Sequence, residues 1–185
     1  MEGKTKSFDG PISEMWLDAW RKSFTNKLNP DASIEEIRDL ALSYKADQIP
    51  GVSNLVESKF YEILESTHEN MDGDAWSAKL FEDPSHPATD VRFYNSVTKQ
   101  TYEVNYKLTD NVNYIESHLE KYPDKPVITN PEVAEKMNNP LVSSGEFERH
   151  EVIKLSDEKF NKLLNAEYDL YLQEAAIIGG VLALS

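Results

Sequence analysis

Two neighbouring β-rich runs carry the side chains of this sequence that could do chemistry together. Asp90 opens the first run, and the second run reads Thr-Tyr-Glu-Val-Asn-Tyr-Lys over residues 101–107. Successive side chains alternate between the two faces of a strand, so Asn105 and Lys107 project from the same face. The short connection between the runs predicts a hairpin. The sequence therefore gathers an acid and an amine at one polar edge of a sheet.

The order of elements around this edge, with helix, strands, hairpin, helix and strand over residues 90–129, resembles the core of the PD-(D/E)xK, restriction-endonuclease-like proteins. In that family one strand carries an Asp, and the next carries a Glu or Gln followed two residues later by a Lys. A further Glu often comes from the preceding helix. The resemblance implies Asp90, Asn105 and Lys107 as candidate catalytic residues. It also implies Asp90 and Glu103 as candidate metal ligands, Mg²⁺ as cofactor and nucleic acid as partner.

In such a site, two carboxylates and a backbone carbonyl hold Mg²⁺ through their oxygen atoms. The metal activates water and stabilises the phosphate oxyanion, while the lysine supports the developing charge. This sequence departs from the pattern, because Asn105 replaces the Glu or Gln and a neutral amide is a weak Mg²⁺ ligand. Glu103 could substitute for it only in a shifted register. The upstream acid stays open among three glutamates of the third predicted helix, Glu57, Glu62 and Glu65.

Other motifs are absent or incomplete. The acidic turn with Asp72 and Asp74 lacks the ligand offsets of an EF-hand loop, so a solvated turn is expected. The four histidines form no HExxH pair and no triad pattern. His118 lies on a predicted amphipathic helix, where a surface or boundary position is expected. No glycine-rich nucleotide-binding motif occurs.

Helices are predicted on the N-terminal side of the sheet. Trp16 and Trp20 are four residues apart and share one face of the first helix, which predicts a core-facing stripe. Ser33 begins a capping-box pattern for a second helix. Ser53 is predicted to cap a third helix. Residues 76–81 are predicted as either a short strand or a helical turn.

A second helix–strand succession is predicted after the hairpin. Asp110 is expected to cap a helix that closes before Pro123, because proline cannot continue it. Residues 126–129 form a short apolar strand, and a further helix opens at Asn130. Residues 142–145 are predicted as a loop.

The C-terminal part changes character along its length. Residues 147–155 are predicted as a strand that charged residues interrupt, and Ser156 is expected to cap a long final helix. Residues 175–184 carry no charge, but the run is shorter than the roughly 20 apolar residues needed to span a bilayer. Three interpretations stay open: a helix end buried in the core, the start of a membrane segment that continues beyond residue 185, or an oligomer contact.

The composition limits the classes of function. The 185 residues have a formal net charge of −14, which repels nucleic acid and anionic lipid and favours basic partners or simple solubility. Cysteine is absent, which excludes disulfides, thiol catalysis and cysteine zinc sites. The N-terminus has no apolar signal region, so a cytoplasmic location is expected, at the inner face of a membrane if the C-terminal run is an anchor. Residues 94–107 and 118–137 also look like a segment of uncharacterised bacterial proteins that precedes glycine-rich membrane segments.

These patterns predict one α+β domain over residues 1–185. An N-terminal helical layer (1–70) packs on a small mixed sheet (88–140), and a long helix follows (156–185). The first hypothesis for function is a non-enzymatic interaction or accessory domain without a cofactor, which binds a protein partner or itself and is tethered to a membrane if the anchor interpretation holds. The alternative is an Mg²⁺-dependent nuclease-like protein, either active or degenerate, with nucleic acid as its partner.

Overall fold

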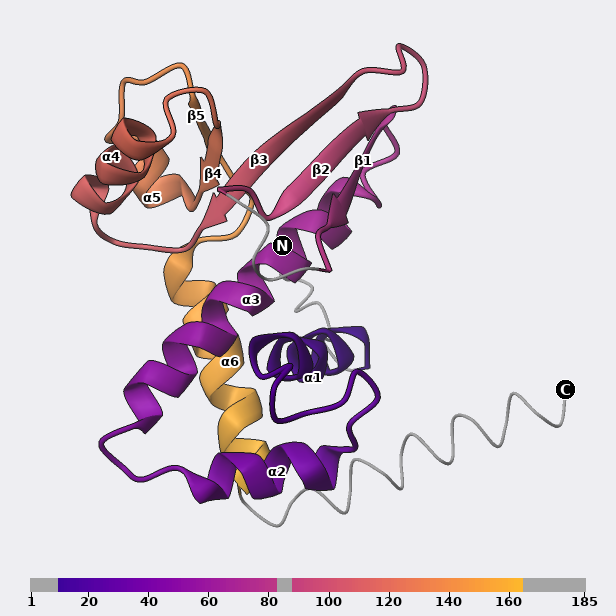
Figure 1. The fold of residues 1–185 in the computed structure, drawn as a ribbon, viewed down its shortest axis with the longest axis vertical. Helices are drawn as coiled ribbons and strands as arrows, with labels where there is room; N and C mark the ends of the chain where they lie inside the picture. Colours follow the sequence, from indigo (N-terminus) through magenta and orange to yellow (C-terminus); the bar gives the residue numbers. More distant parts are fainter. Residues whose placement is uncertain (1–9, 83–87, 165–185) are drawn as a thin grey trace, which may run out of the picture. The chain divides into compact units, whose positions relative to one another are not determined.

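The computed structural model describes residues 10–82 and 88–164, and within these the chain has mixed α+β structure (Figure 1). The helices are α1 (Pro11–Ser23), α2 (Ile34–Ser43), α3 (Ile49–Glu69), α4 (Val112–Lys121), α5 (Pro131–Ala134) and α6 (Arg149–Leu164). The strands are β1 (Trp76–Leu80), β2 (Val91–Asn95), β3 (Thr101–Lys107), β4 (Val127–Thr129) and β5 (Val142–Ser144). The predicted α+β class, with N-terminal helices, a mixed sheet and a C-terminal helix, is confirmed.

The chain divides into two compact units. The helical unit comprises residues up to Val56 and from Leu155 onward, and the sheet unit comprises Glu57–Lys154. The division falls within α3 and within α6. The prediction that residues 1–185 form one domain stays a prediction.

The sheet has five strands in the order β1-β2-β3-β4-β5. The pairs β1–β2 and β2–β3 are antiparallel, whereas the pairs β3–β4 and β4–β5 are parallel. Parallel neighbours need a crossover connection, and α4 and α5 provide the two crossovers (Figure 1). The predicted hairpin between β2 and β3 is confirmed. Its turn uses a left-handed residue, Lys99, and the Asn95 side chain accepts hydrogen bonds from the next amides.

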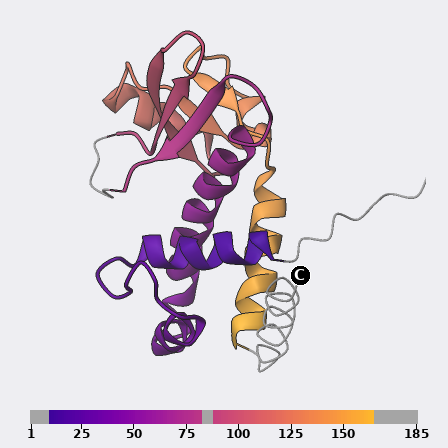
Figure 2. The same ribbon diagram turned by 90° about the vertical axis from the view of Figure 1, so that its right-hand side faces the viewer.

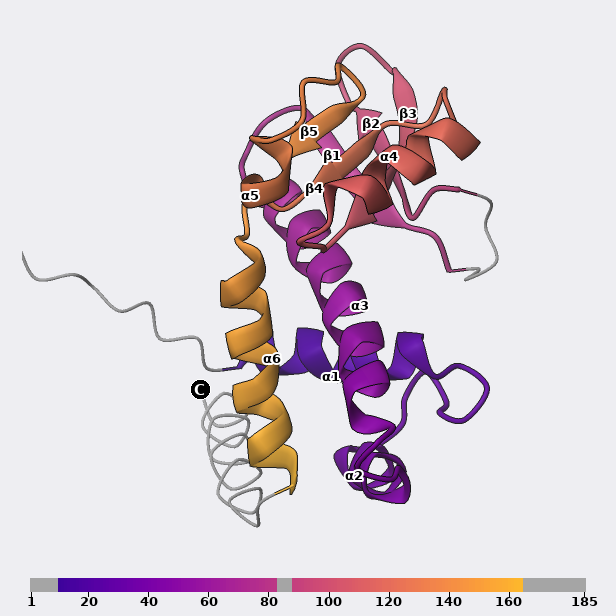
Figure 3. The same cartoon turned by 90° about the vertical axis from the view of Figure 1, so that its left-hand side faces the viewer.

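The two faces of the sheet are covered differently. On one face, the ring of Tyr106 on β3 contacts those of Tyr61 on α3 and Phe93 on β2, with centroids 6.0 and 6.5 Å apart. α4 packs beside β4, where Ile115 and Val127 share one buried cluster (Figure 3). Burial along β3 does not follow the predicted alternation, because Val104, Asn105 and Tyr106 are all buried in this central strand and Tyr102 is exposed.

In the helical unit, α1 packs against the C-terminal part of α6 (Figure 2). Trp16 and Trp20 are 2% and 1% exposed, which confirms the predicted core stripe. The Trp20 ring stacks on Phe160 with centroids 6.0 Å apart, and the Trp16 indole N–H donates to the Ser156 hydroxyl at 3.0 Å. Since a buried indole N–H needs an acceptor, Ser156 serves the core of this unit.

That contact explains one error of the sequence analysis. The strand predicted over residues 147–155 and the cap predicted at Ser156 are both wrong, because a single helix begins at Arg149 and passes through both. Its buried positions are Val152, Ser156, Lys159 and Leu163, and their spacing of four, three and four residues is helical. The Ser156 hydroxyl accepts a hydrogen bond from the Trp16 indole within this helix, and Ser156 is therefore not the N-cap that was predicted.

Other boundaries also differ from prediction. α3 begins at Ile49 rather than after Ser53, because Pro50 is tolerated in the first helical turn, where its missing N–H costs nothing. Asn111, rather than Asp110, caps α4. Residues 76–80 form a strand, and the predicted loop at 142–145 contains β5. The capping box at Ser33 is confirmed.

The apolar run at residues 175–184 lies outside the described residues. Within the part of the chain that the structure describes, no helix has both the length and the apolar character needed to cross a membrane.

Candidate functional site

Strand pairing places Asp90 against the strand that carries Asn105 and Lys107. The β2–β3 register aligns Val91 with Val104, and the Asp90 amide donates to the Val104 carbonyl at 2.9 Å. The Asp90 carboxylate in turn accepts the Tyr106 amide at 3.0 Å. The acid is therefore fixed opposite Asn105, at the end of β3.

The Asn105 side chain is 4% exposed and only half satisfied. Its amide nitrogen donates to the Ala88 carbonyl at 3.2 Å. Its Oδ1 atom is buried and has no hydrogen-bond partner among the described residues. A buried acceptor without a donor is uncommon in native proteins, and a bound ion or water is one of its explanations.

Among the three candidate upstream acids, Glu62 is influenced by the charges of Asp90 and Lys107. Glu62 is buried on α3, and burial raises the pKa of its carboxyl to about 7; the Lys59 ammonium lowers the pKa, the Asp90 carboxylate raises it and Lys107 lowers it. Lys59 pairs with Glu62 at 2.5 Å. Glu62, Asp90 and Lys107 therefore lie close enough for each charge to act on the same carboxyl.

Glu65, one helical turn further along α3, has a different task. Its carboxylate accepts the backbone amides of Glu146 and Phe147 at 3.0 and 3.2 Å. Burial raises the pKa of Glu65, and these backbone hydrogen bonds oppose the rise. Glu65 thus anchors the segment that follows β5.

Glu103 lies on β3 with two cations around its carboxylate. Arg92 approaches one carboxylate oxygen at 2.9 Å and Lys125 approaches the other at 3.7 Å. A metal ion bound by Glu103 would compete with both cations. Glu62 and Asn105 are therefore better candidates than Glu103 to share a metal ion with Asp90.

His118 on α4 has the boundary position that was predicted for it, with intermediate burial. Its Nε2 atom is buried and has no partner among the described residues. Burial lowers the pKa of His118, Lys107 lowers it further and Asp90 opposes this. Helical spacing could have placed Tyr114 and His118 on one face, but only the fold turns that face toward Lys107.

Two other groups of acidic or histidine side chains bring their ligand atoms within 4.8 Å of one another among the described residues. They are Glu132 with Glu148 and His150, and Glu69 with Asp72 and Asp74. In the second group, Asp72 accepts the Asp74 amide at 3.0 Å. The second group is the predicted solvated turn.

No family model, no curated protein and no solved structure matches this chain. We refer to Glu62, Asp90, Asn105 and Lys107 together as the Asp90 edge.

Proposed function

We propose that the sheet unit is a nuclease-like domain of the PD-(D/E)xK type, which uses a divalent metal ion to cleave phosphodiester bonds in nucleic acid. The observation that carries this proposal is the Asp90 carboxylate, which the Tyr106 amide holds at 3.0 Å opposite Asn105, a residue whose buried Oδ1 atom has no hydrogen-bond partner among the described residues. The charges of Asp90 and of Lys107 on β3 also influence the carboxyl of Glu62 on α3. These residues stand on a succession of helix, three antiparallel strands, helix and parallel strand. That succession and that placement of the acid and the lysine are what the family resemblance implies.

The oxygen atoms at this edge fit a hard cation. Mg²⁺ and Mn²⁺ prefer carboxylate and carbonyl oxygens. Asp90 keeps one carboxylate oxygen besides the one that accepts the Tyr106 amide, and Asn105 offers its unpartnered Oδ1 atom. With Glu62 these residues would hold the ion, and the bound ion would activate water for attack on phosphorus.

The chain's own groups then have separate tasks. The Tyr106 amide holds the Asp90 carboxylate in one orientation. The Lys107 ammonium stabilises the negative charge that grows on the phosphate oxygens during attack. Glu62 keeps its proton up to about pH 7, so binding of the cation is coupled to release of that proton.

The test is a titration with Mn²⁺ and Mg²⁺ combined with a plasmid-nicking assay. Wild-type protein should bind the ion and nick the plasmid, and Asp90→Ala should lose both properties. Asp110→Ala is the matched control, because this substitution removes the same charge from the same unit and the Asp110 side chain is 80% exposed. If Asp90→Ala and Asp110→Ala behave alike in both assays, the proposal is wrong.

A second hypothesis, the non-enzymatic interaction or accessory domain, has its own support. Asn105 lacks the charge of the family's glutamate, so the site holds one negative charge fewer, and the net charge of −14 works against an anionic substrate. Under this hypothesis the fold is kept and catalysis is lost. Wild-type protein would then fail to nick at any metal concentration, whether or not it binds the ion.

A further inference from the structure

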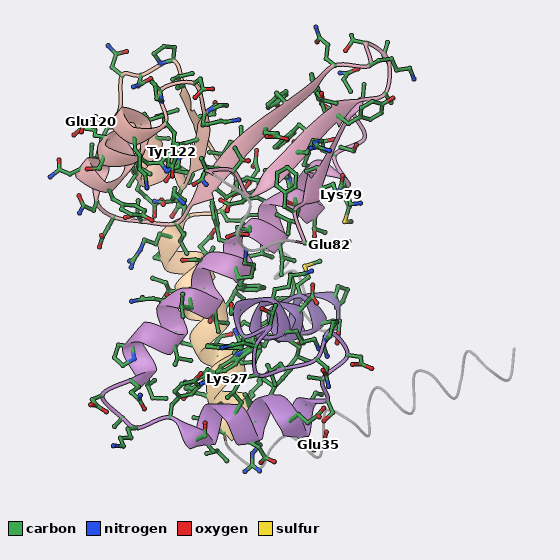
Figure 4. All side chains as sticks on the ribbon, viewed as in Figure 1. Lys27, Glu35, Lys79, Glu82, Glu120 and Tyr122 are labelled. Carbon is green, nitrogen blue, oxygen red and sulfur yellow. The ribbon has the colours of Figure 1, made fainter. Side chains whose placement is uncertain are left out.

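One face of α4 combines aromatic rings with cations. Since 3.6 residues make one helical turn, Tyr114, His118 and Lys121 fall within about 60° of arc, and Tyr122 is the non-helical C-cap residue that follows Lys121. We call these four residues the α4 platform. Figure 4 labels Tyr122 at the end of α4 and Glu120 at its outer edge.

The acidic residues of the helix lie on another side. The same helical spacing places Glu116 and Glu120 roughly opposite the platform. They line a pocket together with Leu119, a residue of the buried cluster beneath α4. The platform therefore presents rings and positive charge with no acidic residue of α4 among them.

Contacts among the described residues show that the rings and the cations are adjacent. The His118 and Tyr122 rings have centroids 5.1 Å apart, and the Lys121 ammonium lies 5.0 Å from the Tyr122 centroid. At the other end, the Lys107 ammonium lies 5.8 Å from the Tyr114 centroid. Tyr114 is 51% exposed, so its ring is available to a ligand. The platform thus begins beside Lys107, a member of the candidate site.

Single-stranded nucleic acid has the chemistry that matches this surface. Unpaired bases stack on aromatic rings without regard to sequence, while lysines contact the phosphates between them. Tyr114 and Tyr122 are eight residues apart, about 12 Å at 1.5 Å per residue, and the His118 ring lies 5.1 Å from that of Tyr122, so an extended strand can reach both tyrosine rings. A duplex keeps its bases stacked on one another and offers none of them to a tyrosine ring.

We propose that the α4 platform, together with Lys107, binds single-stranded nucleic acid and leads the strand to the Asp90 edge. This inference rests on the proposed function, because it names the form of nucleic acid that the nuclease-like site takes. Tyr114 and Tyr122 stack the bases, and Lys107 and Lys121 contact the phosphates.

The experiment measures binding without catalysis. Fluorescein-labelled dT12 and a 12-base-pair duplex are titrated with the full chain in EDTA at low salt, and anisotropy is recorded. We expect the single strand to bind at least tenfold more tightly than the duplex. Tyr114→Ala and Tyr122→Ala should each weaken dT12 binding by about tenfold, within the range measured for base–aromatic stacking. Tyr114→Phe should keep wild-type affinity.

Tyr94→Ala is the matched control. Tyr94 is also an exposed tyrosine, at 38%, and the Lys99 ammonium lies 5.9 Å from its ring centroid, but it belongs to β2 and not to the platform. Its removal should leave dT12 binding unchanged. Circular dichroism verifies that each variant keeps its fold.

Three results would overturn the inference: equal affinity for the duplex, equal losses in the Tyr94 and Tyr114 variants, or competition by poly-glutamate as effective as that by unlabelled dT12. The outcome is separable from that of the proposed function. If metal binding and nicking require Asp90 but dT12 binding ignores Tyr114, only the platform is wrong. If dT12 binding requires Tyr114 but Asp90→Ala changes neither metal binding nor nicking, the nuclease-like function is wrong and the platform stands as a strand-binding surface.

Discussion

The Asp90 carboxylate accepts a hydrogen bond from the backbone amide of Tyr106 at 3.0 Å. This bond joins the residue that precedes β2 to the residue between Asn105 and Lys107 on β3. The side chain of Tyr106 itself points into the aromatic core, where its ring meets Tyr61. The strand is thus fixed by its core side chain and oriented toward the acid by its backbone.

The missing charge at Asn105 leads to the first prediction. Asn105→Asp places a carboxylate of nearly the same shape beside Asp90, so affinity for Mn²⁺ should rise, by tenfold or more in isothermal titration calorimetry, because a charged oxygen ligand replaces a neutral one. The metal-free variant should be less stable, because the new carboxylate is buried at position 105 and is repelled by the half-buried carboxylate of Asp90. Asn113→Asp adds the same charge at an exposed position on α4 and should change neither quantity. An unchanged Mn²⁺ affinity in Asn105→Asp would show that Asn105 does not face the ion.

The pKa of Glu62 predicts how metal binding depends on pH. Burial holds this pKa at about 7 instead of the usual 4.5, so the carboxyl is protonated below pH 7 and must release its proton to bind a cation. Mn²⁺ affinity should therefore increase from pH 6 to pH 8 and release a proton into the buffer, which calorimetry in buffers of different ionisation enthalpy detects. In Glu62→Gln the pH dependence should flatten. If it keeps its wild-type slope in this variant, another group provides the proton.

The same pKa predicts a stability effect that does not involve metal. A carboxyl whose pKa is higher in the folded than in the unfolded state stabilises the fold when protonated. That stabilisation is complete below pH 4.5 and is lost as the pH rises to about 7. At pH 8, Glu62→Gln should therefore be more stable than wild type by up to about 3 kcal/mol, whereas the two should be equal near pH 4.5. Urea unfolding at both pH values measures the difference, with exposed Glu116→Gln as the control.

The local signals of the sequence were sufficient for the hairpin and for α1. Apolar and polar residues alternate around Val104, which is the pattern of a strand, and Trp16 and Trp20 are four residues apart, which is the spacing of one helix face. Ser156 was misassigned because a serine is equally suited to cap a helix or to accept from a buried donor, and only the position of Trp16 decides between them. That position depends on residues 140 apart in sequence.

The choice of the upstream acid shows the same limit. Glu62 and Glu65 are three residues apart on α3, and helical spacing puts them on one face. Their tasks differ because the backbone amides at Glu146 and Phe147 reach Glu65, while Asp90 and Lys107 act on Glu62. These partners come from distant segments, so no local pattern distinguishes the two acids.

The anchor formed by Glu65 leads to the last prediction. A Cβ atom added at Gly145 would collide with the Glu65 carboxylate and with the Tyr61 hydroxyl, and both side chains are buried. Gly145→Ala should therefore lower the free energy of unfolding by about 1–3 kcal/mol, the usual cost of overpacking, as measured by urea denaturation. Gly51→Ala is the matched control, because Gly51 lies within α3 with open space around its Cβ position. That variant should gain about 0.5–1 kcal/mol, since alanine is the better helix former. Equal effects of the two substitutions would mean that the segment after β5 is not held against Glu65.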